Sequence, residues 1–101
     1  MSRSLRDTSF ASPLPLGDFN PLPPGGEITV FCNADAAGDT VTIMVGGIRV
    51  AQLELGVESA AGVGPIVPDH LVAKWRNNTN APLDIQITTT GDNDDILLFL
   101  D

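Results

Sequence analysis

The chain of 101 residues is strongly acidic, with 13 Asp and Glu residues against five Lys and Arg and a formal net charge of −8, so direct binding to nucleic acid or to an anionic membrane is not expected. At this length the chain forms one domain, and a hydrophobic share of 43% with a positive mean hydropathy excludes global disorder. No apolar run approaches the ~18 residues of a transmembrane helix, and we expect no secretory signal because no apolar segment follows Arg3 and Arg6.

Residues 1–26 differ in composition from the rest of the chain. They contain five of the eight prolines, which remove backbone donors and disfavour both a long helix and a central strand. Apolar side chains are nevertheless spaced along this stretch and need a surface to cover them. The sequence therefore predicts an extended proline-rich arm that crosses either its own domain or a neighbouring subunit. The arm residues expected at such an interface are Phe10, Leu14, Leu16, Phe19 and Leu22.

From residue 27 onward the pattern is typical of β-strands. Residues 40–45 alternate with a period of two, and the Gly46-Gly47 pair that follows favours a tight hairpin because both glycines accept positive φ. Residues 48–55 then form the returning strand. The expected strands are 27–32, 40–45, 48–55, 71–76, 83–90 and 95–101. A long loop at 56–70, rich in glycine and small residues, is expected to have a function or to dock on another surface.

No window indicates a helix, and turns recur at intervals of about ten residues. The predicted fold is all-β, a small antiparallel β-sandwich of the jelly-roll or immunoglobulin-like kind. The predicted organisation is an N-terminal arm at 1–26 and a sandwich domain at 27–101.

The last strand carries apolar residues on both of its faces. Ile96, Leu98 and Leu100 point one way, whereas Leu97 and Phe99 point the other way. A half-exposed strand of a monomer alternates apolar with polar residues, and a large apolar patch on a soluble protein usually marks an interface. Met44 and Leu53 likewise give the hairpin more apolar side chains than one buried face accounts for. The sequence thus predicts a homo-oligomer, for which a trimer is our hypothesis, with Met44, Leu53, Leu97 and Phe99 as interface residues of the domain.

Residues that could carry chemistry are few. The only histidine, His70, and the only cysteine, Cys32, are not placed together by any sequence pattern, so we expect no catalytic residues and no enzyme activity. One Cys and one His cannot build a tetrahedral zinc site within one chain, although His70 from three subunits could converge on a symmetry axis and bind a metal there. Asp92, Asp94 and Asp95 lack the glycine and glutamate positions of a calcium loop and read as a solvated turn. The sequence therefore predicts no metal and no cofactor.

Three stretches carry a resemblance to a known family: FCNADAAGDTVTIMVGG, IRVAQLEL and the C-terminal GDNDDILLFLD. In these stretches the chain resembles the small capsid decoration, or cement, proteins of tailed bacteriophages. The resemblance implies a compact β-sandwich, often trimeric, that binds the major capsid protein on the outside of the virion. There it would lock adjacent capsomers by bridging their edges. In this hypothesis the arm fills grooves between capsid subunits or between protomers. A protein without residues 1–26 is then expected to stay folded but no longer attach to the capsid.

The alternative hypothesis is a small β-sandwich module that binds a carbohydrate or another ligand. Trp75, which lies between Lys74 and Arg76, would be its stacking platform, and Asp92, Asp94 or Asp95 would supply polar or calcium contacts. The shortage of aromatic residues, with one tryptophan and no tyrosine, counts against a sugar site. A core or interface position for Trp75 is the simpler interpretation.

Overall fold

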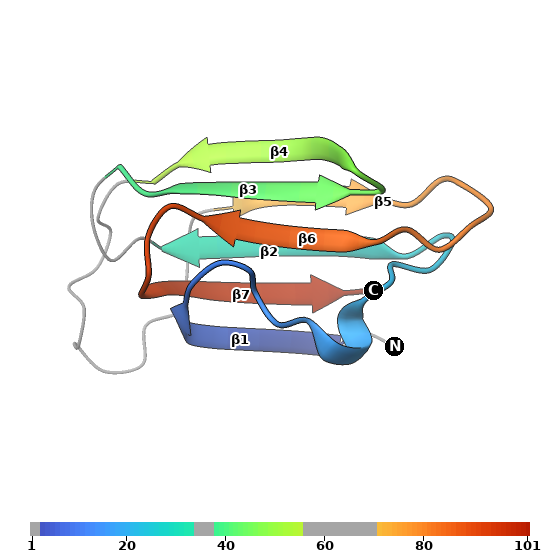
Figure 1. Ribbon diagram of the computed structural model, residues 1–101. Helices are drawn as coiled ribbons and strands as arrows, with labels where there is room; N and C mark the ends of the chain where they lie inside the picture. Colours follow the sequence, from blue (N-terminus) through green and yellow to red (C-terminus); the bar gives the residue numbers. More distant parts are fainter. Residues whose placement is uncertain (1–2, 34–37, 56–70) are drawn as a thin grey trace.

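The computed structural model describes residues 3–33, 38–55 and 71–101. Within these ranges the chain forms two antiparallel sheets that face each other (Figure 1), with one short 3-10 helix. The elements are β1 (Arg3–Phe10), η1 (Gly17–Phe19), β2 (Glu27–Asn33), β3 (Thr40–Val45), β4 (Ile48–Glu54), β5 (Leu71–Arg76), β6 (Ile85–Thr89) and β7 (Asp94–Leu100). The predicted all-β class and two-sheet architecture are confirmed.

One sheet has four strands in the order β1-β7-β2-β5, and the other has three in the order β4-β3-β6. The hairpin predicted at 40–55 is present as β3 and β4. Gly46 and Gly47 form its turn with φ values of +61° and +79°, a region that other residues rarely adopt. In β3, Val41, Ile43 and Val45 are buried, as the period-two pattern predicts.

The core lies between the sheets and consists of aliphatic and phenylalanine side chains together with Cys32. From β2 it takes Ile28 and Val30, and from β7 it takes Ile96 and Leu98, all of which are fully buried. In the part of the chain that is described, no helix is both long and apolar enough to span a membrane.

The structure does not show residues 3–26 as a separate arm. β1 pairs antiparallel with β7, and the proline-rich segment after β1 runs beside β6 (Figure 1), where the Leu14 amide donates to the Ile87 carbonyl at 3.0 Å. The Leu22 amide then donates to the Leu83 carbonyl at 2.8 Å. Residues 3–26 thus contribute a strand and one closing side of the sandwich itself.

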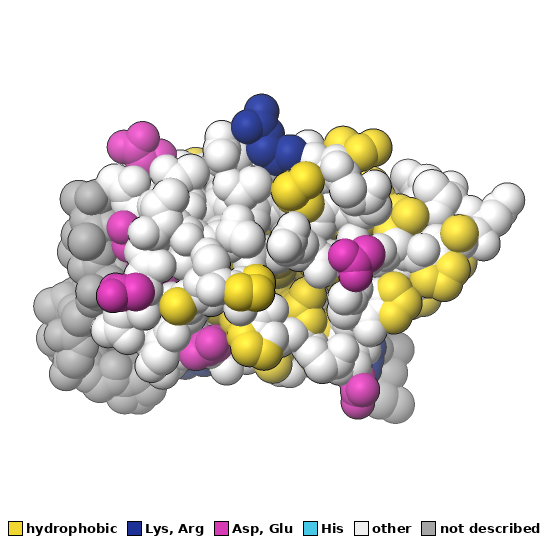
Figure 2. Space-filling view, in the orientation of Figure 1, with side chains coloured by type: hydrophobic (Ala, Val, Ile, Leu, Met, Phe, Trp, Pro, Cys, Tyr) yellow, Lys and Arg dark blue, Asp and Glu magenta, His cyan; other side chains and the backbone are white. Residues whose placement is uncertain are grey.

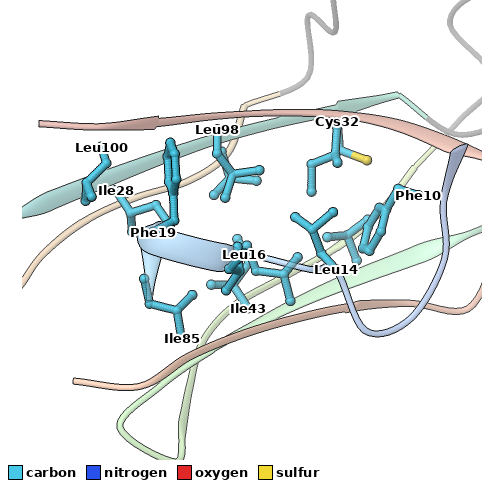
Figure 3. Packing of buried hydrophobic residues seen from close by; sticks show 14 of the residues in the cluster. Phe10, Leu14, Leu16, Phe19, Ile28, Cys32, Ile43, Ile85, Leu98 and Leu100 are labelled. Atoms are coloured by element: carbon cyan, nitrogen blue, oxygen red, sulfur yellow. The ribbon is translucent and has the colours of Figure 1, made fainter. Parts of the chain in front are cut away.

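The five apolar residues predicted to make interface contacts from the arm lie in the core of their own chain. Phe10 and Leu22 have no exposed surface, and the other three are at most 8% exposed. Figure 3 shows Phe10, Leu14, Leu16 and Phe19 pointing in among the side chains of both sheets. The physical reason is that a sandwich with sheets of four and three strands leaves one side open, and these side chains fill it. Because they are buried in their own chain, these five residues are not available for contact with another subunit in this structure. They are Phe10, Leu14, Leu16, Phe19 and Leu22.

Candidate interaction surfaces

The outer face of the four-stranded sheet carries a group of partly exposed apolar side chains. Phe31 of β2 lies opposite Leu97 of β7 and opposite Leu71 of β5, and residues that pair directly share a face of the sheet. Phe99 of β7 lies on the same face, with its ring edge-on to Phe31 at a centroid separation of 6.1 Å and an angle of 86°. We call these residues the aromatic strip: Phe31, Leu71, Leu97 and Phe99.

Exposure separates the aromatic strip from the core. Leu71 is 53% exposed and Phe99 is 37% exposed, and both are among the most exposed large hydrophobic residues of the described chain. Phe31 and Leu97 are half-buried. The strip thus spans three neighbouring strands of one sheet and remains accessible to water.

Ion pairs border the aromatic strip on two sides. On β1, the Arg6 guanidinium donates to both carboxylate oxygens of Asp95, at 3.1 Å and 2.7 Å. On the other side, Lys74 and Arg76 of β5 lie 3.6 Å and 3.5 Å from the carboxylate of Glu27. Three of the five basic residues therefore lie around this strip. An apolar centre with a polar rim is the usual anatomy of a protein interface.

The structure brings together only two of the four domain residues that the sequence assigned to an interface. Leu97 and Phe99 belong to the aromatic strip. Met44 lies half-buried on the outer face of the other sheet, paired with Gln86, and Leu53 is half-buried against the core. Sequence reasoning missed Phe31 and Leu71. The exposed position of Phe31 could have been predicted from the sequence, because the period of two in its strand puts it on the face opposite to Ile28 and Val30.

Of the residues considered for catalysis or metal binding, Cys32, Asp94 and Asp95 have structural roles. Cys32 is fully buried; burial, and then the nearby negative charges of Asp94 and Asp95, raise the pKa of its thiol well above the ordinary value. The thiol therefore stays neutral and unreactive. His70 lies outside the described residues. Among the residues that the structure does describe, no three His, Cys, Asp or Glu side chains form a group that could hold a metal ion.

The acidic turn near the C-terminus is only partly the solvated loop that the sequence predicts. Asp92 is exposed, but Asp94 is fully buried and accepts a hydrogen bond from the Thr89 hydroxyl. Asp95 holds Arg6, as described above. Two of the three carboxylates thus tie strand ends together, which accounts for the acidic cluster without a ligand.

Trp75 lines a pocket of about 300 Å³ at the end of the sandwich where the β3–β4 turn meets the connection from β5 to β6. It lies on the inner side of β5, because it pairs with the buried Ile28. The pocket is formed mainly by Val45, Ile48, Val50, Trp75, Thr79 and Leu83. Ile48, at 69%, is the most exposed large hydrophobic residue of the described chain.

Comparison with known proteins gives no match to a family model, to a curated protein or to a solved structure.

Proposed function

We propose that this protein is a structural, non-catalytic β-sandwich that assembles through the aromatic strip into a homo-oligomer on a larger protein lattice. The single observation that carries the proposal is the exposure of Phe31, Leu71, Leu97 and Phe99 as one group on one sheet face, bordered by ion pairs. An exposed apolar patch of this kind on a soluble protein is often a functional site.

The size of the face favours repeated weak contacts over one tight contact. Four strands at about 4.8 Å spacing and seven residues at about 3.3 Å rise give a sheet face of roughly 440 Å². Two such faces pressed together bury about 900 Å², less than the ~1,200 Å² of a stable standard interface. A surface of this size holds well only when several copies engage at once, since linked contacts add avidity.

A repetitive surface supplies those simultaneous contacts, and the outside of a viral capsid is the one that the resemblance to phage decoration proteins suggests. In this proposal the partners are the major capsid protein and further copies of the chain, with a trimer as the expected oligomer. The net charge of −8 then keeps the outward surface of the assembled particle soluble.

Sedimentation velocity over a range of concentrations tests the self-assembly. The wild-type protein is expected to show a concentration-dependent oligomer, and Phe99→Lys, which puts a charge into the strip, is expected to remain a monomer. The matched control is Gln86→Lys, the same new charge on the exposed outer face of the three-stranded sheet. It should behave as wild type. A wild-type monomer at every concentration would contradict self-assembly.

The capsid partner requires a separate experiment. Co-sedimentation with heads assembled from the major capsid protein of the same genome should carry the wild-type protein and Gln86→Lys into the pellet and leave Phe99→Lys in the supernatant. Equal binding of all three proteins would remove the aromatic strip from the attachment surface. No binding of the wild type would refute the capsid as partner.

A further inference from the structure

The pocket beside Trp75 lies apart from the aromatic strip. Trp75 is on the inner side of β5, whereas the strip lies on the outer face of the same sheet. The walls of the pocket come from both sheets and from the connection after β5, so it opens where the sandwich ends. The described residues that line it are aliphatic apart from Gly46, the indole of Trp75 and the hydroxyl of Thr79, and none of them is charged.

The hydrogen-bonding groups at the pocket are engaged within the protein. The Thr79 hydroxyl donates to the Asn77 side-chain oxygen in its own turn, at 2.6 Å. The Gly46 amide donates to the Asp84 carbonyl at 2.8 Å. A sugar in this pocket would lose water from several hydroxyl groups and gain few partners, which is costly. The pocket therefore disfavours the carbohydrate ligand of the alternative hypothesis.

The charged residues next to the lining in the sequence have their partners elsewhere. Arg49 lies on the outer face of the three-stranded sheet, where it binds a glutamine side chain at 3.2 Å. Lys74 and Arg76 lie on the outer face of the other sheet, with Glu27. The Asp84 carboxylate accepts a hydrogen bond from an asparagine side chain at 2.8 Å. A charge carried into the pocket would lose water without gaining an ionic partner, so the site favours a neutral ligand.

We propose that this pocket binds a neutral, apolar small molecule whose body rests against Trp75. An apolar body that displaces poorly held water from apolar walls gains free energy. The volume of about 300 Å³ is about twice that of the ~150 Å³ apolar cavity that takes up benzene, so a body of roughly eight to ten carbon atoms fits. The exposed Ile48 at the rim extends the apolar contact beyond the pocket.

The volume also favours a free molecule over a side chain of a partner protein. One phenyl side chain has about the size of benzene and would leave about half of the pocket unfilled. Unfilled space of this kind forfeits the contacts that its walls would otherwise make.

Trp75 is the only tryptophan, so its indole N–H gives a single NMR cross-peak that reports on the pocket. The probe is p-xylene, titrated into the full-length protein below its solubility limit, and a saturable shift of this cross-peak is expected. Hydroquinone has the same shape with a hydroxyl in place of each methyl group. It is expected to bind at least tenfold more weakly, because both hydroxyls lose water without gaining partners. Added salt should not weaken p-xylene binding, because no ionic contact is involved.

Two variants locate the site. Val50→Phe places a ring in the pocket from a half-buried position and should weaken p-xylene binding at least tenfold. Gln86→Phe adds the same ring on the exposed outer face of the same sheet, and as the matched control it should bind as wild type does. Ile48→Ser removes the apolar rim at an exposed position with little risk to folding and should weaken binding several-fold. Each variant should keep the wild-type circular dichroism spectrum.

The proposal is overturned if p-xylene produces no saturable shift, if hydroquinone binds as tightly, or if Val50→Phe and Ile48→Ser both bind as wild type does. A cross-peak that p-xylene leaves in place but that moves when the protein alone is diluted would show a second copy in the pocket, and the small-molecule proposal would be wrong. The titration reads the pocket and not the aromatic strip, so this proposal and the proposed function fail separately.

Discussion

Deletion of residues 1–26 should unfold this protein rather than release a stable core domain. The deleted segment supplies Phe10, Leu14, Leu16, Phe19 and Leu22 to the core, all at most 8% exposed. Full burial of a side chain of this size is worth about 1.5–3 kcal/mol, so five of them contribute roughly 8–15 kcal/mol. The whole stability of a domain is typically about 5–15 kcal/mol. The burial free energy lost with this segment is therefore as large as the whole free energy of unfolding of a typical domain.

The deletion also removes β1 and uncovers the edge of β7. Asp95 loses Arg6, and the backbone groups of β7 that pair with β1 are left without partners. Far-UV circular dichroism and thermal unfolding measure the result, and we expect no cooperative transition. Addition of a synthetic peptide of residues 1–26 should restore one, because the contacts are with this segment and not with its covalent connection.

A point substitution tests the same reasoning in a protein that still folds. Leu22→Ala removes a fully buried side chain and should cost about 2–5 kcal/mol. Leu97→Ala, on the half-buried outer face, is the matched control and should cost clearly less. A truncated protein that unfolds cooperatively at the wild-type temperature, or a Leu22→Ala variant no less stable than Leu97→Ala, would refute the integration of residues 3–26 into the core.

Two further predictions concern single buried groups. Asn77→Ala removes a fully buried amide that donates to the Leu22 and Ala81 carbonyls, at 3.0 Å and 2.9 Å, and should lower the free energy of unfolding in urea by about 1–3 kcal/mol. Asn78→Ala, at the exposed neighbouring position, should have little effect, and equal effects of the two variants would contradict the role of the buried amide. The pKa of Cys32 is raised in the folded state, so the unfolded chain loses the thiol proton first as the pH rises. The free energy of unfolding is therefore unaffected by this group below the unfolded-state pKa of about 8.5, and above it should fall by up to ~1.4 kcal/mol per pH unit. Urea unfolding of wild type and Cys32→Ala between about pH 7 and 10, a window of roughly one and a half units either side of that pKa, measures this, and an equal slope in both proteins would show that Cys32 is not its source.

The strands that the sequence predicted best are those in which local pattern and tertiary position agree. In β3 and β6, apolar residues recur at every second position and this series faces the core, so the period alone places Ile43, Ile85 and Ile87 correctly; Met44 is the one apolar residue of these strands on the outer face. The turn at Gly46-Gly47 adds a backbone requirement that only glycine meets easily. Both signals are local, which is why they can be read without a structure.

The placement of residues 3–26 could not be read in the same way. Proline interrupts the regular period, so the apolar residues of this segment reach the core from an irregular backbone. The polar sequence of β1 conceals a strand whose partner, β7, is about 90 residues away in the chain. Whether such a segment covers its own domain or another subunit depends on the open side of the sandwich, which exists only after the two sheets have formed.

The pocket beside Trp75 was equally hidden from the sequence. Its walls come from residues 45–50 and 75–83, which are neighbours only because β4 and β5 are edge strands on the same side of the two sheets. The sequence indicated that Trp75 lies between two cations. It did not indicate that the indole faces inward with Ile28 while Lys74 and Arg76 face the opposite way, with Glu27.

The two outer faces of the sandwich differ in a way that gives the molecule a direction. Figure 2 views the side of the three-stranded sheet, where acidic side chains, and a basic group at the upper edge, lie around a surface of mostly neutral atoms with several apolar groups. Thr42, Gln52 and Gln86 lie on this face and suit contact with water. The aromatic strip lies on the opposite sheet. In the proposed assembly the strip attaches and the polar face remains in solvent, so Met44→Lys, on the polar face, should attach as wild type does. If Met44→Lys failed to attach while remaining folded, both faces would be contact surfaces and this one-sided arrangement would be wrong.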